Sequence, residues 1–279
     1  MAMNVTAKRK VNICKASPFK YPELNLDVHL AGSHIDNQQF AEMFVQSRCV
    51  GVSDPLMADL VVFTGGPDVS PILYGEEKCS NTYVNINRDI RDIELFDICK
   101  ANGIPMVGIC RGAQFLHVMN GGKLYQHVNG HHGNHDIEDV VTKRIIRTSS
   151  VHHQMVRPNT SGGMEIIATC PIGQGATTRQ INPTSCLPGA LEDVEAFYYE
   201  DTMCIGFQGH PEYRGYDEYT AWCLNCIEDY VITYSTMILI DNVYRIPSGA
   251  RAVRDEKHKK AGLVTPSKYL LKVPAKELN

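Results

Sequence analysis

The sequence has no apolar run that approaches the length of a membrane span, and its 279 residues carry a formal net charge of only −4. A helix that crosses a bilayer needs about 20 apolar residues in a row, so no transmembrane segment is expected. The weak net charge gives no reason to expect nucleic acid or an anionic membrane as a partner. The first ten residues lack the apolar segment of a signal peptide, and this predicts a cytoplasmic protein.

The ten cysteines lack the paired spacing of a zinc site. Several lie inside apolar runs, as Cys14, Cys99 and Cys204 do, and without a signal peptide most are expected to be reduced core residues. Cys223 and Cys226 form a CxxC, but it falls inside a helical pattern and no second cysteine pair accompanies it. A redox or zinc role for this pair is therefore not expected.

Four histidines, His127, His131, His132 and His135, stand close together in the sequence. They contain no helical i, i+4 pair accompanied by a glutamate, which is the spacing typical of a zinc-binding helix. They also fall in a Gly- and Asn-rich stretch. We therefore expect a solvated loop here and no bound metal, with a metal site as the alternative.

Short apolar runs alternate with amphipathic stretches along most of the chain, and this predicts an α/β fold with a largely parallel central sheet. The expected strands cover residues 11–14, 60–64, 104–109 and 203–208, and the expected helices cover residues 37–45, 88–99, 111–119 and 217–230. In the helix 88–99, the apolar residues Ile90, Ile93, Phe96 and Ile98 are expected near one face. Residues 140–147, 151, 164–168 and 194–199 predict a smaller β-rich subregion.

The last part of the chain is basic. Residues 251–276 contain eight Lys or Arg residues against Asp255 and Glu256. We expect a domain over residues 10–243 and a basic C-terminal extension over residues 244–279 that packs on the surface. A basic arm for a partner or nucleic acid is the alternative, but few aromatic residues are available there to stack on bases.

The segment 107–114 reads Val-Gly-Ile-Cys-Arg-Gly-Ala-Gln and joins an apolar strand pattern to an apolar helical pattern. Gly108 and Gly112 flank Cys110, and such glycines permit a sharp strand-to-helix turn. This is the pattern of a nucleophile elbow with cysteine in the place of serine. A thiol at a helix N-terminus is also favoured as a thiolate. The segment therefore predicts a thiol-dependent acyl-transfer enzyme.

His210, Pro211 and Glu212 follow another apolar strand pattern. Proline favours extended backbone before it, and in extended backbone residues two apart project to the same side. His210 and Glu212 can therefore meet, which is how a catalytic triad orients its imidazole. A surface His and Glu beside a turn is the alternative.

Two further segments end strand patterns. Gly65 and Gly66 follow residues 60–64, and one of their backbone N–H groups, together with that of Arg111, could form an oxyanion hole. An ordinary β-turn is the alternative for the glycine pair. His152 and His153 end a β-rich segment, and one of these histidines could line a pocket.

Together these segments resemble the class I glutamine amidotransferase-like superfamily, and within it the gamma-glutamyl hydrolase-like cysteine peptidases, including gamma-glutamyl-gamma-aminobutyrate hydrolases. The matching segments lie between about residue 10 and residue 231, at 63–71, 88–94, 108–114, 120–126, 151–154 and 206–212. The resemblance implies a flavodoxin-like three-layer sandwich with a mostly parallel sheet. It also implies a catalytic triad of Cys110, His210 and Glu212, and no cofactor.

The resemblance assigns further roles around the triad. It implies an oxyanion hole formed by the backbone amides of Gly66 and Arg111. It also implies a substrate pocket with Gly65, Gln114 and His153. Two residues depart from the family pattern, because Gly209 stands where an aromatic residue is usual and Ser149 where the hydrolases often have asparagine.

The implied function is that of a glutamine amidotransferase-type amidohydrolase, which cleaves a small gamma-glutamyl amide through a thioester on the cysteine. It would release ammonia from glutamine or an amine from another gamma-glutamyl compound. An amidotransferase would need a separate synthetase partner, because the sequence shows no synthetase domain. A catalytically inactive binding or regulatory module on the same fold is the alternative.

Overall fold

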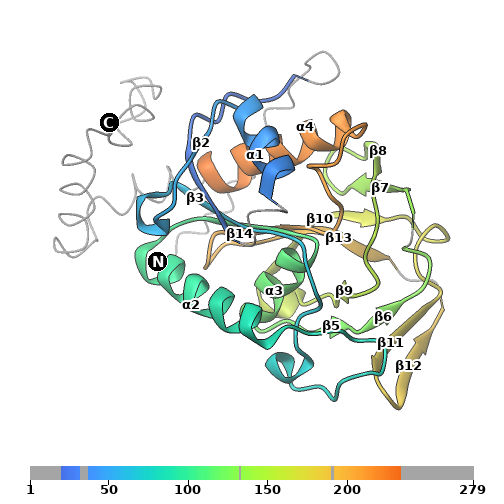
Figure 1. The fold of residues 1–279 in the computed structure, drawn as a ribbon. Coiled ribbons are helices and arrows are strands. Elements are labelled where there is room, and N and C mark those ends of the chain that lie inside the picture. Colours follow the sequence, from blue (N-terminus) through green and yellow to red (C-terminus); the bar gives the residue numbers. More distant parts are fainter. Residues whose placement is uncertain (1–19, 32–36, 132, 190–191, 234–279) are drawn as a thin grey trace, which may run out of the picture.

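The computed structural model describes residues 20–31, 37–131, 133–189 and 192–233. Its centre is a nine-stranded sheet with the order β2-β1-β3-β4-β14-β13-β10-β7-β8. The strands from β2 to β14 are parallel to one another, and those from β13 to β8 extend the sheet in antiparallel pairs. The prediction of an α/β fold with a mostly parallel central sheet is confirmed (Figure 1).

The parallel strands are β2 (Val50–Gly51), β1 (Asp27–Ala31), β3 (Leu60–Phe63), β4 (Met106–Ile109) and β14 (Cys204–Phe207). The antiparallel strands are β13 (Asp193–Tyr199), β10 (Met164–Cys170), β7 (His135–Asp139) and β8 (Ile145–Thr148). Helices α1 (Asn37–Gln46) and α4 (Asp217–Cys226) cover one face of this sheet, and α2 (Ile86–Asn102) and α3 (Arg111–Met119) cover the other (Figure 1). Three short 3-10 helices lie at Pro55–Met57, Pro71–Tyr74 and Thr160–Gly162, and α4 continues as a π-helix over Ile227–Thr233.

The three layers follow from the alternation of side chains along fully buried strands. In β3, Leu60 and Val62 belong to the apolar cluster that contains α1 and α4, whereas Val61 and Phe63 belong to the cluster with α2 and α3. Successive side chains of a strand point to opposite faces, so a continuous apolar run needs cover on both sides. The result is the flavodoxin-like three-layer sandwich that the resemblance implies.

The smaller β-rich subregion is also present. Strands β5 (Leu124–Tyr125) and β9 (Met155–Val156) pair with each other, and β6 (His127–Val128), β11 (Thr178–Asn182) and β12 (Ser185–Pro188) form a three-stranded sheet. Most of the expected segment 140–147 is a turn rather than a strand. The Asp139 carboxylate accepts hydrogen bonds from the N–H groups of Val141 and Thr142, which holds the chain in this turn before β8.

Helix α3 has the bounds that the sequence predicts, while other elements differ. The expected strand 11–14 and the proposed extension 244–279 lie outside the described residues, as do both ends of the proposed domain 10–243. The first described strand is β1, which the sequence analysis did not identify. Its apolar residues alternate with Asp27 and His29, so no continuous apolar run marks it.

The predicted apolar face of α2 is wrong in part. Phe96 is buried as expected, but Ile90 and Ile98 are exposed. Arg88, Asp89 and Asp92 are buried in this helix instead. Charged residues are buried only when they are paired, and these pair with one another and with Arg111 of α3, as described below.

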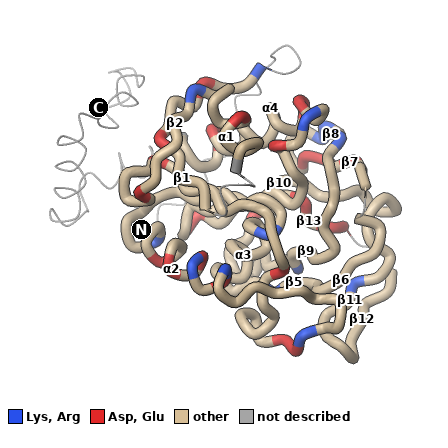
Figure 2. The backbone as a smooth tube through the Cα atoms, in the orientation of Figure 1, with Lys and Arg blue, Asp and Glu red and all other residues tan. Residues whose placement is uncertain are grey.

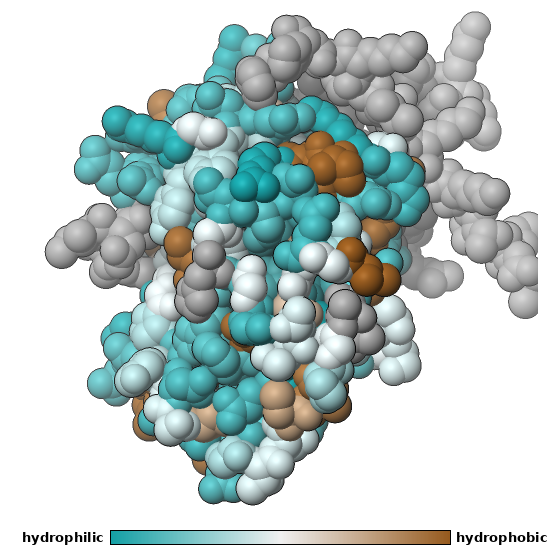
Figure 3. Space-filling view, turned by 90° about the vertical axis from the view of Figure 1, so that its right-hand side faces the viewer, coloured by the Kyte–Doolittle hydropathy of each residue, from teal (hydrophilic) through white to brown (hydrophobic). Residues whose placement is uncertain are grey.

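The described surface is mixed in charge and mostly polar. Lys, Arg, Asp and Glu positions are interspersed along the backbone rather than separated by sign (Figure 2). The face formed by the right-hand side of Figure 1 is mainly hydrophilic, with apolar residues in small separate groups (Figure 3). Among the described helices, none combines the length and the apolar character that a membrane crossing requires.

The described cysteines are free, and all except Cys186 are buried. This agrees with the expectation that most cysteines are reduced core residues. Cys223 and Cys226 both lie inside α4, where burial raises the pKa of each thiol well above its ordinary value. A high thiol pKa disfavours the reactive thiolate at both cysteines.

The contact between α3 and β3 gives a stability prediction. A Cβ atom on Gly112 would overlap the Phe63 carbonyl group, and both belong to backbone that cannot shift easily. We expect Gly112→Ala to lower the free energy of unfolding by about 2–4 kcal/mol, as measured by urea denaturation. The control is Gly51→Ala, because a Cβ atom there meets nothing within 4 Å. Equal destabilisation by both substitutions would contradict this account.

Candidate active site

Cys110 lies on the turn between β4 and α3 and has an unusual backbone conformation. Its φ and ψ angles are 53° and −110°, a combination that a residue with a side chain rarely adopts. A Cβ atom on Gly108 would collide with the backbone of Gly112 and Ala113, and one on Gly112 would collide with Phe63. The two glycines therefore let α3 begin directly against β3 and β4. This is the sharp strand-to-helix turn that the sequence predicts.

His210 lies next to Cys110 because β14 and β4 are parallel neighbours in the sheet. The carboxyl ends of parallel strands meet at one edge, so the residues that follow β4 and β14 come together there. The Nδ1 atom of His210 donates a hydrogen bond to Glu212 Oε1 at 2.6 Å. Sequence reasoning thus identified three buried side chains that the fold does bring to one place, Cys110, His210 and Glu212.

The charge state of His210 depends on these neighbours. Burial alone lowers the pKa of His210, but the charge of Cys110, a hydrogen bond with it, and the hydrogen bond and charge of Glu212 outweigh burial and raise the pKa to about 10. An imidazolium is therefore favoured at His210, and the Glu212 carboxylate orients this ring beside Cys110.

Two other contacts hold His210 in position. Ser149 Oγ accepts a hydrogen bond from the His210 backbone N–H at 3.0 Å and donates one to the His210 carbonyl oxygen at 3.1 Å. The Tyr213 ring stacks on the imidazole, with ring centroids 4.5 Å apart. Both the backbone and the ring plane of His210 are therefore constrained.

The glycine pair lies at the same edge of the sheet, directly after β3. A Cβ atom on Gly65 would come 3.1 Å from His210 Cε1 and 3.9 Å from Cys110 Cβ. Gly66 has a φ of 148°, which favours glycine. Arg111 is the first residue of α3, where backbone N–H groups have no acceptor inside the helix. The backbone therefore offers N–H groups from two sides of Cys110, and their role as oxyanion donors stays a prediction.

A buried ion cluster supports this turn from behind. The Arg111 guanidinium forms ion pairs with Asp89 and Asp92 of α2. Arg88 donates to Asp92 at 2.9 Å and to the Thr64 carbonyl oxygen, just before the glycine pair, at 3.3 Å. We refer to Arg88, Asp89, Asp92 and Arg111 as the ion cluster. It connects the nucleophile turn to the glycine turn through α2.

A small pocket of about 250 Å³ opens at Cys110. Gly66, Gln114 and His153 are among the residues that line it. Gly65, which the resemblance also placed in the substrate pocket, lies against the His210 ring instead. The Gln114 amide nitrogen also donates to the Gln154 carbonyl oxygen at 3.0 Å, so this side chain holds one wall of the pocket. A larger hollow of about 860 Å³ between β1, α1 and α2 is not lined by Cys110, His210 or Glu212.

Asp68 and Tyr83 also line the pocket, and sequence reasoning gave neither of them a role. Asp68 Oδ1 forms an ion pair with His153 Nε2 at 3.1 Å. The hydrogen bond from His153 to Asp68 raises the pKa of His153. The position of Asp68 just after the glycine pair was the signal that could have identified it.

The two departures from the family pattern occupy one contact region. A Cβ atom on Gly209 would come 2.8 Å from the Tyr219 hydroxyl and 3.0 Å from the Ser149 carbonyl oxygen, so no larger side chain fits in this conformation. Ser149 in turn hydrogen-bonds the His210 backbone. Both departures therefore act on the placement of His210, and neither lines the pocket.

The expected solvated loop at the histidine cluster is wrong for His131 and His135, which are both buried. They face carboxylates of β13, since His131 Nε2 donates to Asp193 Oδ2 at 2.9 Å and His135 Nε2 to Glu195 Oε1 at 3.0 Å. A sequence pattern in one segment does not show partners that lie some 60 residues away. His127 lies beside His153 instead, and His132 is outside the described residues.

The fold and the nucleophile turn together define a class I glutamine amidotransferase-like protein. The sequence profile of the family described as Peptidase C26 matches residues 56–212, which is more than half of the chain. The chain belongs to the peptidase C26 family. The resemblance read from the sequence is thereby confirmed.

Named relatives agree with this class. A protein described as a candidate glutamine amidotransferase from Schizosaccharomyces pombe is 31% identical over 57% of the chain and 64% of its own length. A second one, from Mycobacterium tuberculosis, is 31% identical over 60% of the chain and 54% of its own length. The chain therefore matches less than two thirds of the length of either relative.

Two other similarities cover different parts of the chain. The carbamoyl phosphate synthase small chain of Thioalkalivibrio sulfidiphilus is 34% identical over 39% of this chain and 25% of its own length. The crystal structure of a glutamine amidotransferase from Thermotoga maritima covers 83% of this chain and 90% of that protein, with 17% identity and a TM-score of 0.48.

The ion cluster gives the prediction for this site. Arg111→Leu would leave Asp89 and Asp92 buried with one cation fewer, and we expect the free energy of unfolding to fall by about 3–5 kcal/mol. Urea denaturation measures the loss. The control is Arg147→Leu, which breaks the exposed ion pair with Asp136 and is expected to cost no more than about 1 kcal/mol. A loss no larger for Arg111→Leu than for the control would refute the structural role of the cluster.

Proposed function

We propose that the protein is an amidohydrolase that cleaves a gamma-glutamyl amide through a thioester on Cys110. The observation that carries this proposal is the placement of Cys110 on a strained turn beside His210, whose Nδ1 donates to Glu212 at 2.6 Å. Membership of the peptidase C26 family supports the same class of reaction. A thiol, an imidazole and a carboxylate are the side chains that this thioester mechanism uses.

In the proposed first step, the Cys110 thiolate attacks the side-chain carbonyl carbon of the gamma-glutamyl group. The backbone N–H groups of Gly66 and Arg111 stabilise the resulting oxyanion, and one such donor is commonly worth about 3 kcal/mol of barrier. The His210 imidazolium then gives its Nε2 proton to the departing ammonia or amine. Glu212 accepts a hydrogen bond from the protonated Nδ1 atom of His210 throughout, so the ring keeps the required tautomer.

In the second step the neutral His210 removes a proton from water, and the hydroxide attacks the thioester carbonyl carbon. Collapse of the second tetrahedral intermediate expels the Cys110 thiolate and releases glutamate, whose new carboxyl group gives its proton to solvent, while the imidazole keeps the proton taken from water. The thiolate–imidazolium pair is then restored. The cycle therefore consumes one water molecule and releases one amine or ammonia for each amide cleaved.

The polar pair at the pocket supports a glutamyl group as the acyl part. Asp68 offers a carboxylate for the substrate's α-ammonium group, and His153, whose pKa is raised, offers a positive charge for its α-carboxylate. The pocket volume of about 250 Å³ suits one small amino acid side chain. Substrate selection would then rest on the free amino acid end of the gamma-glutamyl compound.

The amine that leaves distinguishes two forms of this function. The peptidase C26 match supports a hydrolase that acts alone, whereas the similarity to carbamoyl phosphate synthase small chains supports a glutaminase that supplies a separate synthetase. We favour the hydrolase, because segments 108–114 and 151–154 resemble that branch. A cytoplasmic location, where thiols stay reduced, suits the free cysteine nucleophile.

The nucleophile is tested by substitution. We expect Cys110→Ala and Cys110→Ser to abolish the thioester, because no other described cysteine lies on such a turn. Intact-protein mass spectrometry after incubation with glutamine or gamma-glutamyl amines detects the acyl-enzyme. The control is Cys186→Ala, since Cys186 is exposed and remote in sequence from the site.

Turnover measured on the purified protein alone decides the outcome. Activity on gamma-glutamyl amines without a partner supports the hydrolase, while activity on glutamine that needs an added synthetase supports the glutaminase. Turnover by Cys110→Ala at the rate of the native protein would disprove the assignment. A folded native protein whose Cys110 reacts with no glutamine-analogue electrophile would favour an inactive binding module.

The charge state of His210 gives a pH prediction. A raised pKa means that His210 stays protonated up to about pH 10, and the imidazolium needed for leaving-group protonation is lost only above that pH. Glu212→Gln removes a negative charge. It should therefore lower the pH at which kcat/KM falls on the alkaline side by about 1–2 units. The pH dependence of kcat/KM measures the shift. An unchanged limb would show that Glu212 does not stabilise the imidazolium.

A further inference from the structure

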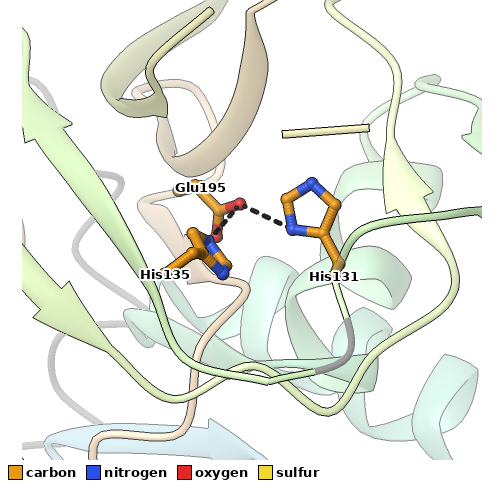
Figure 4. A group of neighbouring side chains, drawn as sticks. All are labelled: His131, His135 and Glu195. Carbon is orange, nitrogen blue, oxygen red and sulfur yellow. Dashed lines mark hydrogen bonds and ion pairs between the residues drawn. The ribbon is translucent and has the colours of Figure 1, made fainter. Parts of the chain in front are cut away.

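A second polar cluster lies outside the pocket at Cys110. His131 precedes β7, His135 is the first residue of β7, and Glu195 lies on β13 (Figure 4). All three are buried, with 0%, 6% and 1% of their surface exposed. One ligand atom of each lies within 4.8 Å of the others. None of the three lines the pocket at Cys110.

The orientation of His131 is set by a complete set of outer contacts. His131 Nε2 donates to Asp193 Oδ2 at 2.9 Å. Asp193 also accepts from the Ala176 N–H at 2.7 Å and from Arg179 at 2.6 and 2.8 Å. Burial raises the pKa of Asp193, but these hydrogen bonds outweigh it and lower the pKa, so the group is a carboxylate. The contact with Asp193 fixes the His131 ring so that its Nδ1 atom faces Glu195.

Two inner atoms of the cluster lack hydrogen bonds, although His135 Nε2 donates to Glu195 Oε1 at 3.0 Å. His131 Nδ1 stands 3.4 Å from Glu195 Oε1, but neither it nor Glu195 Oε2 has a hydrogen-bond partner among the described residues. Buried polar atoms without a partner are costly. A cation held between the rings and the carboxylate would contact both unpartnered atoms.

His152 packs against His131 at the edge of the cluster. Its ring centroid lies 4.9 Å from that of His131, and its Nδ1 donates to the Gln154 carbonyl oxygen at 2.9 Å. The proton on Nδ1 leaves Nε2 as an acceptor, and this buried atom has no hydrogen-bond partner among the described residues. Burial lowers the pKa of His152 to about 3, so the ring is neutral at ordinary pH.

We propose that His131 Nδ1, His135 Nε2 and a Glu195 oxygen bind one divalent transition-metal ion of the zinc class. Imidazole and carboxylate are ligands that zinc prefers. Metal–ligand bonds of about 2.0–2.2 Å at tetrahedral angles separate neighbouring donor atoms by about 3.2–3.6 Å. The 3.0 and 3.4 Å distances to Glu195 Oε1 are close to this range.

The Asp193–His131 hydrogen bond completes the arrangement, because a carboxylate that holds the second ring nitrogen is the usual support of a metal-bound histidine. The ion has a structural role. It joins His131 and β7 to β13, and the His131 ring packs against His152, which lines the pocket at Cys110.

A protonated cluster without metal is the competing state, since Glu195 offsets burial and raises the pKa of His135. The test uses the full chain purified without a histidine tag and measures zinc by elemental mass spectrometry. We expect about one zinc per chain. After chelator treatment, added Zn²⁺ should raise the Tm by about 5 °C or more. The Co²⁺ form should show no sulfur-to-cobalt charge-transfer band.

Substitutions locate the ion. Glu195→Gln and His135→Asn should each weaken zinc binding at least tenfold, in about the range seen for lost metal-site contacts. His29→Asn is the matched control, because His29 is a partly buried histidine that hydrogen-bonds the Val52 carbonyl oxygen outside the cluster. Cys110→Ala should keep the zinc, which excludes Cys110 and His210 as the ligands and separates this result from any failure of the proposed function.

Three results would overturn the site. The first is a folded native protein that holds no zinc and shows no Tm change with excess Zn²⁺. The second is that Glu195→Gln binds zinc as tightly as the native protein does. The third is that Cys110→Ala loses the zinc. If Glu195→Gln does not fold, His135→Asn and the Co²⁺ spectrum of the native protein decide in its place.

Discussion

The buried pairing of Arg111 with Asp89 and Asp92 is the interaction on which the active-site edge depends. Arg111 belongs to the nucleophile turn, the two aspartates belong to α2, and Arg88 extends the same cluster to the Thr64 carbonyl oxygen. Charges taken out of water are costly unless every partner is present, so the cluster tolerates little displacement. It therefore holds Cys110 and the glycine pair at a set separation, although none of its side chains takes part in the proposed reaction.

The proposed chemistry arises where three parallel strands end. Gly65 and Gly66 follow β3, Cys110 follows β4, and His210 follows β14. Each segment contributes a different part of an acyl-transfer site: backbone donors, the nucleophile and the proton carrier. The two departures from the family pattern do not disturb this division, because Gly209 and Ser149 meet each other and the His210 backbone. Their effect is on the position of the imidazole, and neither residue lines the pocket.

Much of the site was predictable because its signals are local. The glycines around Cys110 and the His-Pro-Glu segment act through the backbone of a few neighbouring residues, and α3 begins and ends where the pattern predicts. The predictions that were wrong share one physical reason. The buried charges of α2 and the buried histidines at 131 and 135 depend on partners far along the chain. The metal proposal changes the expectation of a solvated loop for the same reason, since Glu195 lies 60 residues from His135.

The sequence by itself determined the class of fold, the turn that contains Cys110 and the residues of the proposed triad, because apolar periodicity and glycine placement act over short distances. Only the tertiary structure decided which polar groups are buried and what neutralises them. Tertiary contacts place Arg111 against Asp89, where it supports the turn, and pair Asp68 with His153. They also bring His131, His135 and Glu195 within reach of one ion. The physical reason is that the cost of burying a charge is settled by its neighbours in space, and these are assigned when the sheet assembles.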